Sequence, residues 1–349
     1  MFNVNSIVRK NVADMKSYQV TRDGYLKDDK FIFLDNCENN YGSVLGNGLE
    51  RYPSSSQDEL KKAIAKYKKL KKENVFLGNG SDEIIDLLIR CFCEPKQDEL
   101  LICEPTFGMY RLYALLSNVK VNSVPLNKVD FSFDINLILK SITKSTKLLF
   151  LCSPNNPTGT SISDDEIKSI AKNFKGLIVI DEAYIDFSEK KSSLSLLKSI
   201  PNLLVLQTFS KGWGLAGLRV GAAYASVDIT TVLNKVRPPF NLSTLSQQLA
   251  MSAVEVSEGL TSIINKVKEQ KKIASKQLAK LQFVKHVFPS DGNFFLMQVD
   301  DAEKLTAFLL KNKILISNRS SLLNCANCVR ISIGTKGEMN KLYKILKKY

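Results

Sequence analysis

The most unusual stretch of this chain reads Thr208-Phe-Ser-Lys211-Gly-Trp-Gly-Leu-Ala-Gly-Leu-Arg219-Val-Gly221, and it follows an apolar run at residues 203–207. Short apolar runs bounded by polar residues are typical of buried strands. The glycines predict a tight, irregular loop after that strand. The loop would expose Lys211 at the sheet edge, where Ser210 and Arg219 can reach a common anion. Because burial and neighbouring cations lower the pKa of a lysine, this pattern indicates a nucleophilic amine.

Two further motifs follow short apolar runs in the same way. Asp181-Glu-Ala-Tyr184 follows residues 177–180, and Ser153-Pro-Asn-Asn156-Pro-Thr-Gly159 follows residues 148–152. A carboxylate at the end of a buried strand needs a positive partner, and a protonated pyridine nitrogen is one candidate. Asn156 precedes a proline and is biased to an extended backbone, from which its amide could donate to a ring hydroxyl. Taken alone, the Asp181 motif would indicate a helix cap or a structural ion pair, and the Asn156 motif an ordinary turn.

A glycine turn precedes the first apolar helix. Gly78-Asn-Gly-Ser81-Asp82 follows the short run at residues 75–77, and the helix is expected to continue to about residue 93. Ser and Asp favour helix starts, and the N–H groups at a helix start can bind a phosphate. The motif is a weak indicator on its own.

The order of the expected elements predicts an α/β fold. A polar helix over residues 58–72 precedes strands at 75–77, 100–103, 148–152, 177–180 and 203–207. Continuous apolar strands that alternate with helices favour a mostly parallel mixed sheet between helices, with ligands beyond the carboxyl ends of the strands.

The pattern changes after about residue 245. A charged helical stretch at 255–280 leads into alternating strand-like segments at 284–288, 294–299, 314–316 and 329–333, with a helix between them and one at the end. We therefore expect an N-terminal arm and small-domain segment at 1–40, a large domain at 41–245 and a smaller α+β domain at 246–349.

Composition excludes several classes of protein. The 349 residues are 44% hydrophobic, which allows a large core. The net charge of +14 raises nucleic acid as a partner, but the lysines fall in helical runs without interleaved aromatics, so we read them as solvated faces. The one histidine, His286, excludes multi-histidine metal sites, and any Ser-His-Asp chemistry would have to use His286 itself. Its alternating surroundings predict a residue on an edge strand.

The cysteines indicate a reducing compartment. Seven of them are scattered over a chain that shows no signal peptide and no membrane-spanning run, so we expect reduced thiols in a cytoplasmic protein. Cys325 and Cys328 form one CxxC pair without a second pair, and no metal site is expected.

The order and spacing of several segments resemble the fold-type-I pyridoxal-phosphate-dependent aminotransferases over essentially the whole chain, and within them the histidinol-phosphate aminotransferases. The segments are those at residues 33–42, 51–53, 77–83, 104–110, 153–159, 181–184, 208–221 and 329–335. The resemblance implies the fold of that family, with a large cofactor-binding domain and a small domain.

The resemblance also implies a role for individual residues. Lys211 would hold pyridoxal phosphate as a Schiff base and then act as the general base. Asp181 would pair with the pyridine nitrogen, and Tyr184 and Asn156 would hydrogen-bond the ring oxygen. Tyr110 would stack on the ring. The positions that match phosphate-binding residues are Ser81, Asp82, Thr208, Ser210 and Arg219.

Substrate and partner are implied in the same way. Arg330 matches an arginine that grips the substrate carboxylate, Tyr18 matches a tyrosine that closes over the substrate, and Tyr52 matches one that reaches the neighbouring subunit's site, which implies a homodimer. The implied reaction is transamination of L-histidinol phosphate with 2-oxoglutarate to imidazole acetol phosphate and L-glutamate.

The chain departs from the family at one substrate position. Ser317 occupies the place of an arginine that binds the substrate phosphate, and Arg319 lies two residues further on, on the same face if the strand continues. The alternatives are an aminotransferase for aromatic or other amino acids, a decarboxylase of a phosphorylated amino acid, a basic nucleic-acid-binding protein, and a regulatory domain that keeps the cofactor fold without turnover.

Overall fold

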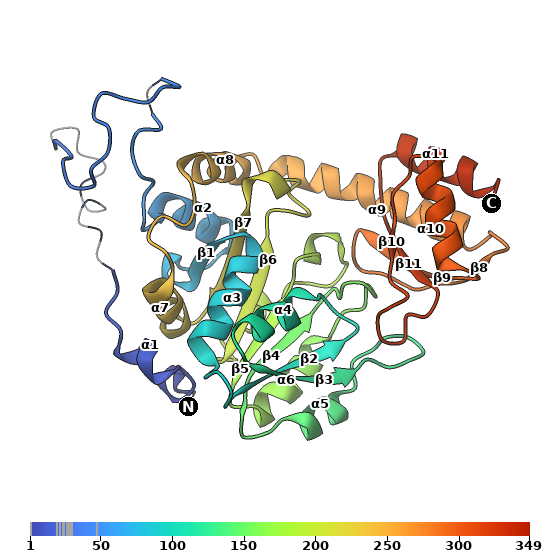
Figure 1. Cartoon of the computed structure of the whole chain (residues 1–349), viewed down its shortest axis with the longest axis horizontal. Coiled ribbons are helices and arrows are strands. Elements are labelled where there is room, and N and C mark those ends of the chain that lie inside the picture. The colour runs from blue at the N-terminus through green and yellow to red at the C-terminus, as the bar shows by residue number, and fades with distance from the viewer. Residues whose placement is uncertain (1, 19, 21, 23–24, 26–30, 47) are drawn as a thin grey trace.

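The computed structural model describes residues 2–18, 20, 22, 25, 31–46 and 48–349 (Figure 1). Its larger part is built on a seven-stranded sheet with the order β1-β7-β6-β5-β4-β2-β3. The strands are β1 (Val75–Asn79), β2 (Glu99–Glu104), β3 (Lys120–Pro125), β4 (Thr146–Cys152), β5 (Leu177–Asp181), β6 (Leu203–Thr208) and β7 (Val220–Ala225). Within this sheet β7 runs antiparallel to both of its neighbours, β1 and β6, and all other neighbouring strands pair in parallel. The predicted mostly parallel, mixed sheet is confirmed.

The central strands are apolar throughout because both faces of the sheet are covered. Leu148 and Phe150 of β4 pack into one core with helices α3 (Gly80–Phe92) and α4 (Met109–Leu116). Leu149 and Leu151 pack into another core with α5 (Ile135–Ser141) and α6 (Asp164–Asn173). Since successive strand residues face opposite sides, a continuous apolar run supplies both cores.

Strands β3 and β7 were not expected from the sequence. β3 is an edge strand with exposed polar residues, and β7 is rich in glycine and alanine, so neither shows a strong apolar signal. The expected helix at 58–72 ends earlier, as α2 (Asp58–Lys68), because Lys69 adopts a left-handed conformation that closes the helix.

The smaller part is a four-stranded antiparallel sheet with the order β10-β11-β9-β8. Its strands are β8 (Val284–Val287), β9 (Phe294–Val299), β10 (Ser317–Asn318) and β11 (Cys328–Ser332), and it packs on α9 (Glu258–Leu278), α10 (Ala302–Lys311) and α11 (Lys336–Leu346). His286 is exposed on the edge strand β8, as predicted.

The strand expected at 314–316 is wrong. The N–H of Ile314 closes the end of α10 by donating to the Leu309 carbonyl at 2.9 Å, and strand pairing begins only at Ser317. Ile314 and Ile316 nevertheless pack against the small core, which explains the alternating pattern that suggested a strand.

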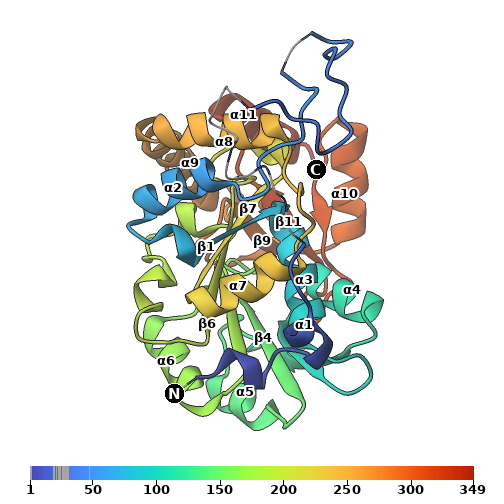
Figure 2. The ribbon, with the colours of Figure 1, turned by 90° about the vertical axis from the view of Figure 1, so that its left-hand side faces the viewer.

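The remaining helices connect these parts. α1 (Lys10–Asp14) and α7 (Val227–Val236) lie on the α3 side of the large sheet, and α8 (Thr244–Glu255) lies beside α2 (Figures 1 and 2). Ala250 and Val254 of α8 pack with β1 and β7. The domain limits at residues 40 and 245 stay predictions.

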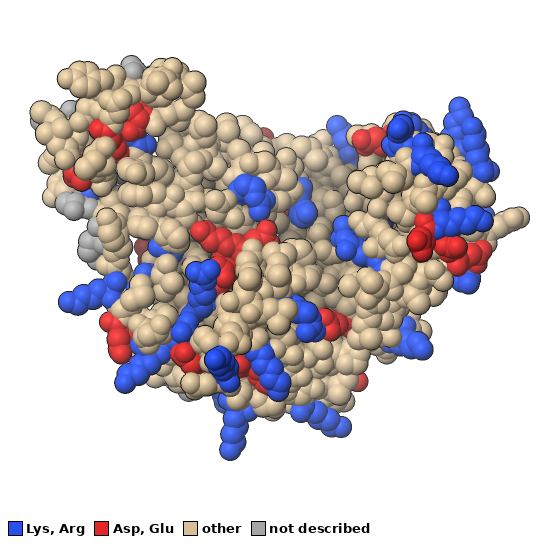
Figure 3. Space-filling view, viewed as in Figure 1, with Lys and Arg blue, Asp and Glu red and all other residues tan. Residues whose placement is uncertain are grey.

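Of the helices described here, none combines the length and apolar character that a bilayer crossing requires. On the face shown in Figure 3, lysines and arginines are scattered over several elements rather than gathered in one stripe.

Candidate active site

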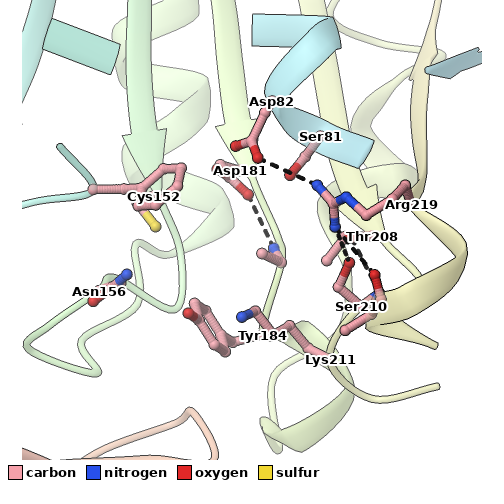
Figure 4. Close-up of a pocket in the computed structure, with 13 residues that line it drawn as sticks. Ser81, Asp82, Cys152, Asn156, Asp181, Tyr184, Thr208, Ser210, Lys211 and Arg219 are labelled. Carbon is pink, nitrogen blue, oxygen red and sulfur yellow. Dashed lines mark hydrogen bonds and ion pairs between the residues drawn. The ribbon is translucent and has the colours of Figure 1, made fainter. Parts of the chain in front are cut away.

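A pocket lies where β4, β5 and β6 end, at the carboxyl edge of the parallel strands (Figure 4). Cys152, Asp181 and Thr208 come from the last positions of these three strands. The lining residues are Ser81, Asp82, Phe107, Cys152, Asn156, Asp181, Ala183, Tyr184, Thr208, Ser210, Lys211, Ala216 and Arg219. The structure thus brings together the strand-end motifs that the sequence singled out.

Asp181 forms the floor of the pocket and is only 3% exposed. Its Oδ2 accepts a hydrogen bond from the Tyr110 hydroxyl at 2.6 Å, and its Oδ1 accepts from the Ala183 N–H at 3.0 Å. Burial raises the pKa of Asp181 to about 6, although both hydrogen bonds oppose that rise. A cationic ligand atom in the pocket would therefore stabilise this carboxylate.

Lys211 projects into the pocket from the loop after β6 (Figure 4). Its Nζ lies 5.5 Å from the centre of the Tyr184 ring. Burial lowers the pKa of Lys211, and the positive charges of Arg330 and Arg219 lower it further. The amine is consequently shifted toward its neutral, nucleophilic form.

The corner of the pocket formed by Arg219, Ser210 and the start of α3 is suited to an anion. Arg219 has a left-handed backbone, and its guanidinium lies 3.3 Å from Ser210 Oγ and 3.4 Å from Asp82 Oδ2. Ser81 and Asp82 stand in the first turn of α3, whose N-terminus faces the pocket. Thr208 Oγ1 accepts from the Ser210 N–H at 3.1 Å and orders the same corner. Hydroxyls, a guanidinium and a helix N-terminus are the groups that bind phosphates.

Asn156 and Tyr184 form the side wall with Cys152. Burial raises the pKa of Tyr184 to about 12, so the phenol stays a proton donor at neutral pH. Arg330 of β11 donates to Asn156 Oδ1 and lies over the Phe294 ring. Through Asn156, the small sheet therefore contacts the pocket.

Arg319 lies close to Arg330. Its N–H donates to the Cys328 carbonyl at 2.8 Å, which extends the pairing of β10 by one residue, and Ser317 pairs directly with Arg330. Arg319 therefore shares a sheet face with Ser317 and Arg330. Its charge lowers the pKa of both Arg330 and Tyr184, and its buried Nε has no hydrogen-bond partner among the described residues.

Besides Arg319 and Arg330, three further predicted site residues lie outside the lining of the pocket. Tyr110 is fully buried beneath Asp181 and does not line the pocket, so it is not placed to stack on a ligand there; Phe107 of the same segment is. Tyr18 is 73% exposed and outside the lining. Tyr52 is 49% exposed, stacks on Phe240 with ring centres 4.6 Å apart, and lines a separate groove.

Sequence reasoning missed the lining residues Phe107, Cys152, Ala183 and Ala216. Cys152 directly precedes the motif at residues 153–159, and Ala183 directly precedes Tyr184, so both lie next to residues that the sequence indicated. Phe107 and Tyr110 are three residues apart at the start of α4, where only packing determines which ring faces the pocket.

Comparison with known proteins agrees with this geometry. The sequence model of the family "Aminotransferase class I and II" matches residues 44–346. A histidinol-phosphate aminotransferase of Cytophaga hutchinsonii is 43% identical over 348 residues, which cover 100% of this chain and 99% of that protein. The chain belongs to the histidinol-phosphate aminotransferase family of class I and II aminotransferases.

Solved structures of this family share the fold. The histidinol-phosphate aminotransferase of Clostridium acetobutylicum superimposes with a TM-score of 0.80 at 26% identity, over 86% of this chain and 90% of that one. The enzyme of Sinorhizobium meliloti, solved in complex with pyridoxal-5'-phosphate, has a TM-score of 0.77 at 20% identity, over 86% and 84% of the two chains.

Class I and II aminotransferases depend on pyridoxal phosphate, and the pocket fits this cofactor. Arg219, Ser210 and the start of α3 form a phosphate-binding corner at one end. The buried carboxylate of Asp181 suits a protonated ring nitrogen, and Lys211 is an amine with a lowered pKa beside it. Phosphate, ring and carbonyl would each meet a group of matching chemistry.

Gly80 permits the phosphate-binding corner to form. Its φ is +76°, and a Cβ built there would lie 2.4 Å from Arg219 Nη2. We expect Gly80→Ala to lower the unfolding free energy by about 1–2 kcal/mol, because the left-handed backbone is strained for alanine. We also expect the dissociation constant for pyridoxal phosphate to rise, because the guanidinium must move. Gly259→Ala, whose Cβ meets nothing within 4 Å, is the control. Unchanged cofactor affinity in Gly80→Ala would contradict the assignment of this corner.

Proposed function

We propose that this protein transfers the amino group of L-histidinol phosphate to 2-oxoglutarate, forming imidazole acetol phosphate and L-glutamate, a step of histidine biosynthesis. The observation that carries the proposal is the 43% identity, over the full chain, to a histidinol-phosphate aminotransferase. The pocket supports it with an amine, a buried carboxylate and a phosphate-binding corner in one place.

Pyridoxal phosphate supplies, when bound, a carbonyl that takes up amino groups and a ring that withdraws electrons. Asp181 would keep the proton on the ring nitrogen, because the low polarity around this carboxylate strengthens such a pair. Asn156 and Tyr184 would donate to the ring oxygen, and Ser81, Asp82, Thr208, Ser210 and Arg219 would surround the phosphate.

Lys211 would move the proton that the reaction displaces. With a substrate bound, its amine would be placed to take the proton from the substrate carbon that bears the amino group. The lowered pKa of Lys211 favours this role, because a neutral amine accepts a proton and an ammonium does not. The positive charges of Arg330 and Arg219 help to keep it neutral.

Arg330 and Arg319 would bind the anionic groups of the substrates. Burial and the charge of Arg319 lower the pKa of Arg330, and among the described residues no carboxylate forms an ion pair with it. Two guanidiniums on one sheet face repel each other unless an anion lies between them. Arg330 would bind the carboxylate of glutamate or 2-oxoglutarate, and Arg319 would bind the phosphate of histidinol phosphate in place of the arginine that Ser317 replaces. Tyr18 would close over the substrate.

Ser317 favours a second candidate, an aminotransferase for aromatic or other amino acids that lack a phosphate. Loss of the arginine at that position removes one phosphate contact, and Arg319 would then serve another anion. The relative turnover of L-histidinol phosphate and phenylalanine separates the two candidates.

The test is an absorption spectrum of the purified protein with pyridoxal phosphate, recorded before and after L-histidinol phosphate is added without a keto acid. We expect the band of the bound carbonyl form to fall and that of the aminated cofactor to appear. A band that responds to glutamate but not to histidinol phosphate would move the substrate to the second candidate. The absence of any cofactor band would refute the proposal as a whole.

We also propose a homodimer in which Tyr52 completes the partner's site. Tyr41, Val44 and Leu45, on the segment that leads to Tyr52, are each more than 80% exposed, as expected for a surface that a second copy covers. The cytoplasmic location stays a prediction.

Mixing two inactive variants tests the shared site. A hybrid dimer of Tyr52→Ala and Lys211→Ala carries one site in which both residues are intact. After random exchange of equal amounts, about half of the dimers are hybrid and half of their sites are intact. We therefore expect about a quarter of the activity of the unmodified protein. Activity that stays at the level of the separate variants after subunit exchange would contradict a shared site.

A further inference from the structure

The position of Tyr110 does not fit the ring-stacking role that the family resemblance implied. It is fully buried, stacks on Phe150 with ring centres 4.8 Å apart, and meets Phe107 edge-on at 5.6 Å. Both contacts hold the ring, so its hydroxyl has a fixed direction. That hydroxyl donates to Asp181 Oδ2 at 2.6 Å.

We propose that Tyr110 is a positioning residue for Asp181: its hydroxyl holds the carboxylate charged and aimed at the ring nitrogen of the cofactor. The inference rests on the proposed function, because Asp181 acts on the cofactor in that scheme. It replaces the stacking role expected from the sequence, which Phe107 is placed to fill.

The hydrogen bonds of Asp181 support this role. Among the described residues, its side chain accepts from two donors, the Tyr110 hydroxyl and the Ala183 N–H. A hydrogen bond to a charged acceptor is about twice as strong as a neutral one. Each donor occupies one oxygen, so the carboxylate cannot rotate without breaking both bonds.

A hydrogen-bond donor to Asp181 favours the charged form of this buried carboxyl group. Burial raises the pKa of Asp181 and the charge of Asp82 raises it further, while Tyr110, Ala183 and Lys211 lower it. Burial also raises the pKa of Tyr110 well above its ordinary value, so the phenol keeps its proton and donates throughout the working range. Without that donor, the pKa of Asp181 would move further up, and more of the carboxyl would be protonated at neutral pH.

The test compares Tyr110→Phe with Tyr224→Phe. Phenylalanine keeps the ring and its stacking, and Tyr224 in β7 is an equally buried tyrosine that makes no hydrogen bond to Asp181 among the described contacts. The apoprotein of each variant is titrated with pyridoxal phosphate between pH 6 and 8, and quenching of Trp213, the one tryptophan of the chain, reports binding.

We expect the dissociation constant of Tyr110→Phe to rise about tenfold near neutral pH, as the loss of one charge-assisted hydrogen bond implies. The ratio to the unmodified protein should grow as the pH falls, because the carboxyl of the variant protonates at a higher pH. Tyr224→Phe should bind like the unmodified protein.

Two results would overturn the inference: a pH-independent ratio near one, or an equal loss in Tyr224→Phe, which would indicate a general effect of removing a buried hydroxyl. In both of these cases the unmodified protein binds the cofactor, so the proposed function stands. Failure of the unmodified protein itself to bind pyridoxal phosphate would instead refute the proposed function.

Discussion

Lys211→Ala is expected to lose the absorption band of covalently bound cofactor and to reduce turnover by on the order of 10⁴-fold or more. Lys211 is the one lysine among the described residues that line the pocket, and its amine would supply both the attachment and the proton transfer. General acid–base catalysis alone contributes roughly 10²–10⁴-fold. The measurements are the visible spectrum of the purified variant and its rate of glutamate formation from 2-oxoglutarate and L-histidinol phosphate.

The matched control is Lys191→Ala, which removes an exposed lysine from the same part of the chain. It should keep both the band and the rate. Arg219 and the start of α3 are intact in Lys211→Ala, so that variant should still bind pyridoxal phosphate without a covalent link. Normal multiple turnover by Lys211→Ala would refute the central assignment.

Arg319→Ala is expected to lower kcat/KM for L-histidinol phosphate by about 10- to 100-fold and to change that for glutamate little. One charge-assisted contact to an anion is worth about 1.5–3 kcal/mol, and each 1.4 kcal/mol corresponds to a factor of ten. The selective loss follows because Arg319 would bind the phosphate, whereas Arg330 would bind the carboxylate of glutamate. The measurement is the rate of each half-reaction as a function of substrate concentration.

The converse variant sharpens this prediction. Ser317→Arg places an arginine directly opposite Arg330, at the position where the family resemblance leads us to expect one. Combined with Arg319→Ala, it should recover much of the lost activity toward the phosphorylated amine. Equal losses for both substrates in Arg319→Ala, with no recovery in the double variant, would contradict this prediction. Arg319 would then act in folding or in binding a group that both substrates have in common. Arg90→Ala, an exposed arginine on α3, serves as the control.

The α/β architecture and most of the candidate pocket could be predicted from the amino-acid sequence. The apolar runs that became β4, β5 and β6 are legible because a strand covered on both faces must be apolar at every position. Asp181, Lys211 and Arg219 follow such runs, and the carboxyl ends of parallel strands meet at one edge, so their proximity followed from local patterns.

Which neighbouring side chains complete the site depends on packing and strand register. Tyr110 and Phe107 lie in one segment, and the packing of Tyr110 on Phe150 directs its hydroxyl to Asp181 and leaves Phe107 at the pocket wall. Arg319 came beside Arg330 through the register of β10 and β11, which pairs Ser317 with Arg330. Strand register and side-chain packing depend on contacts between residues far apart in the chain. Local sequence patterns do not predict these contacts.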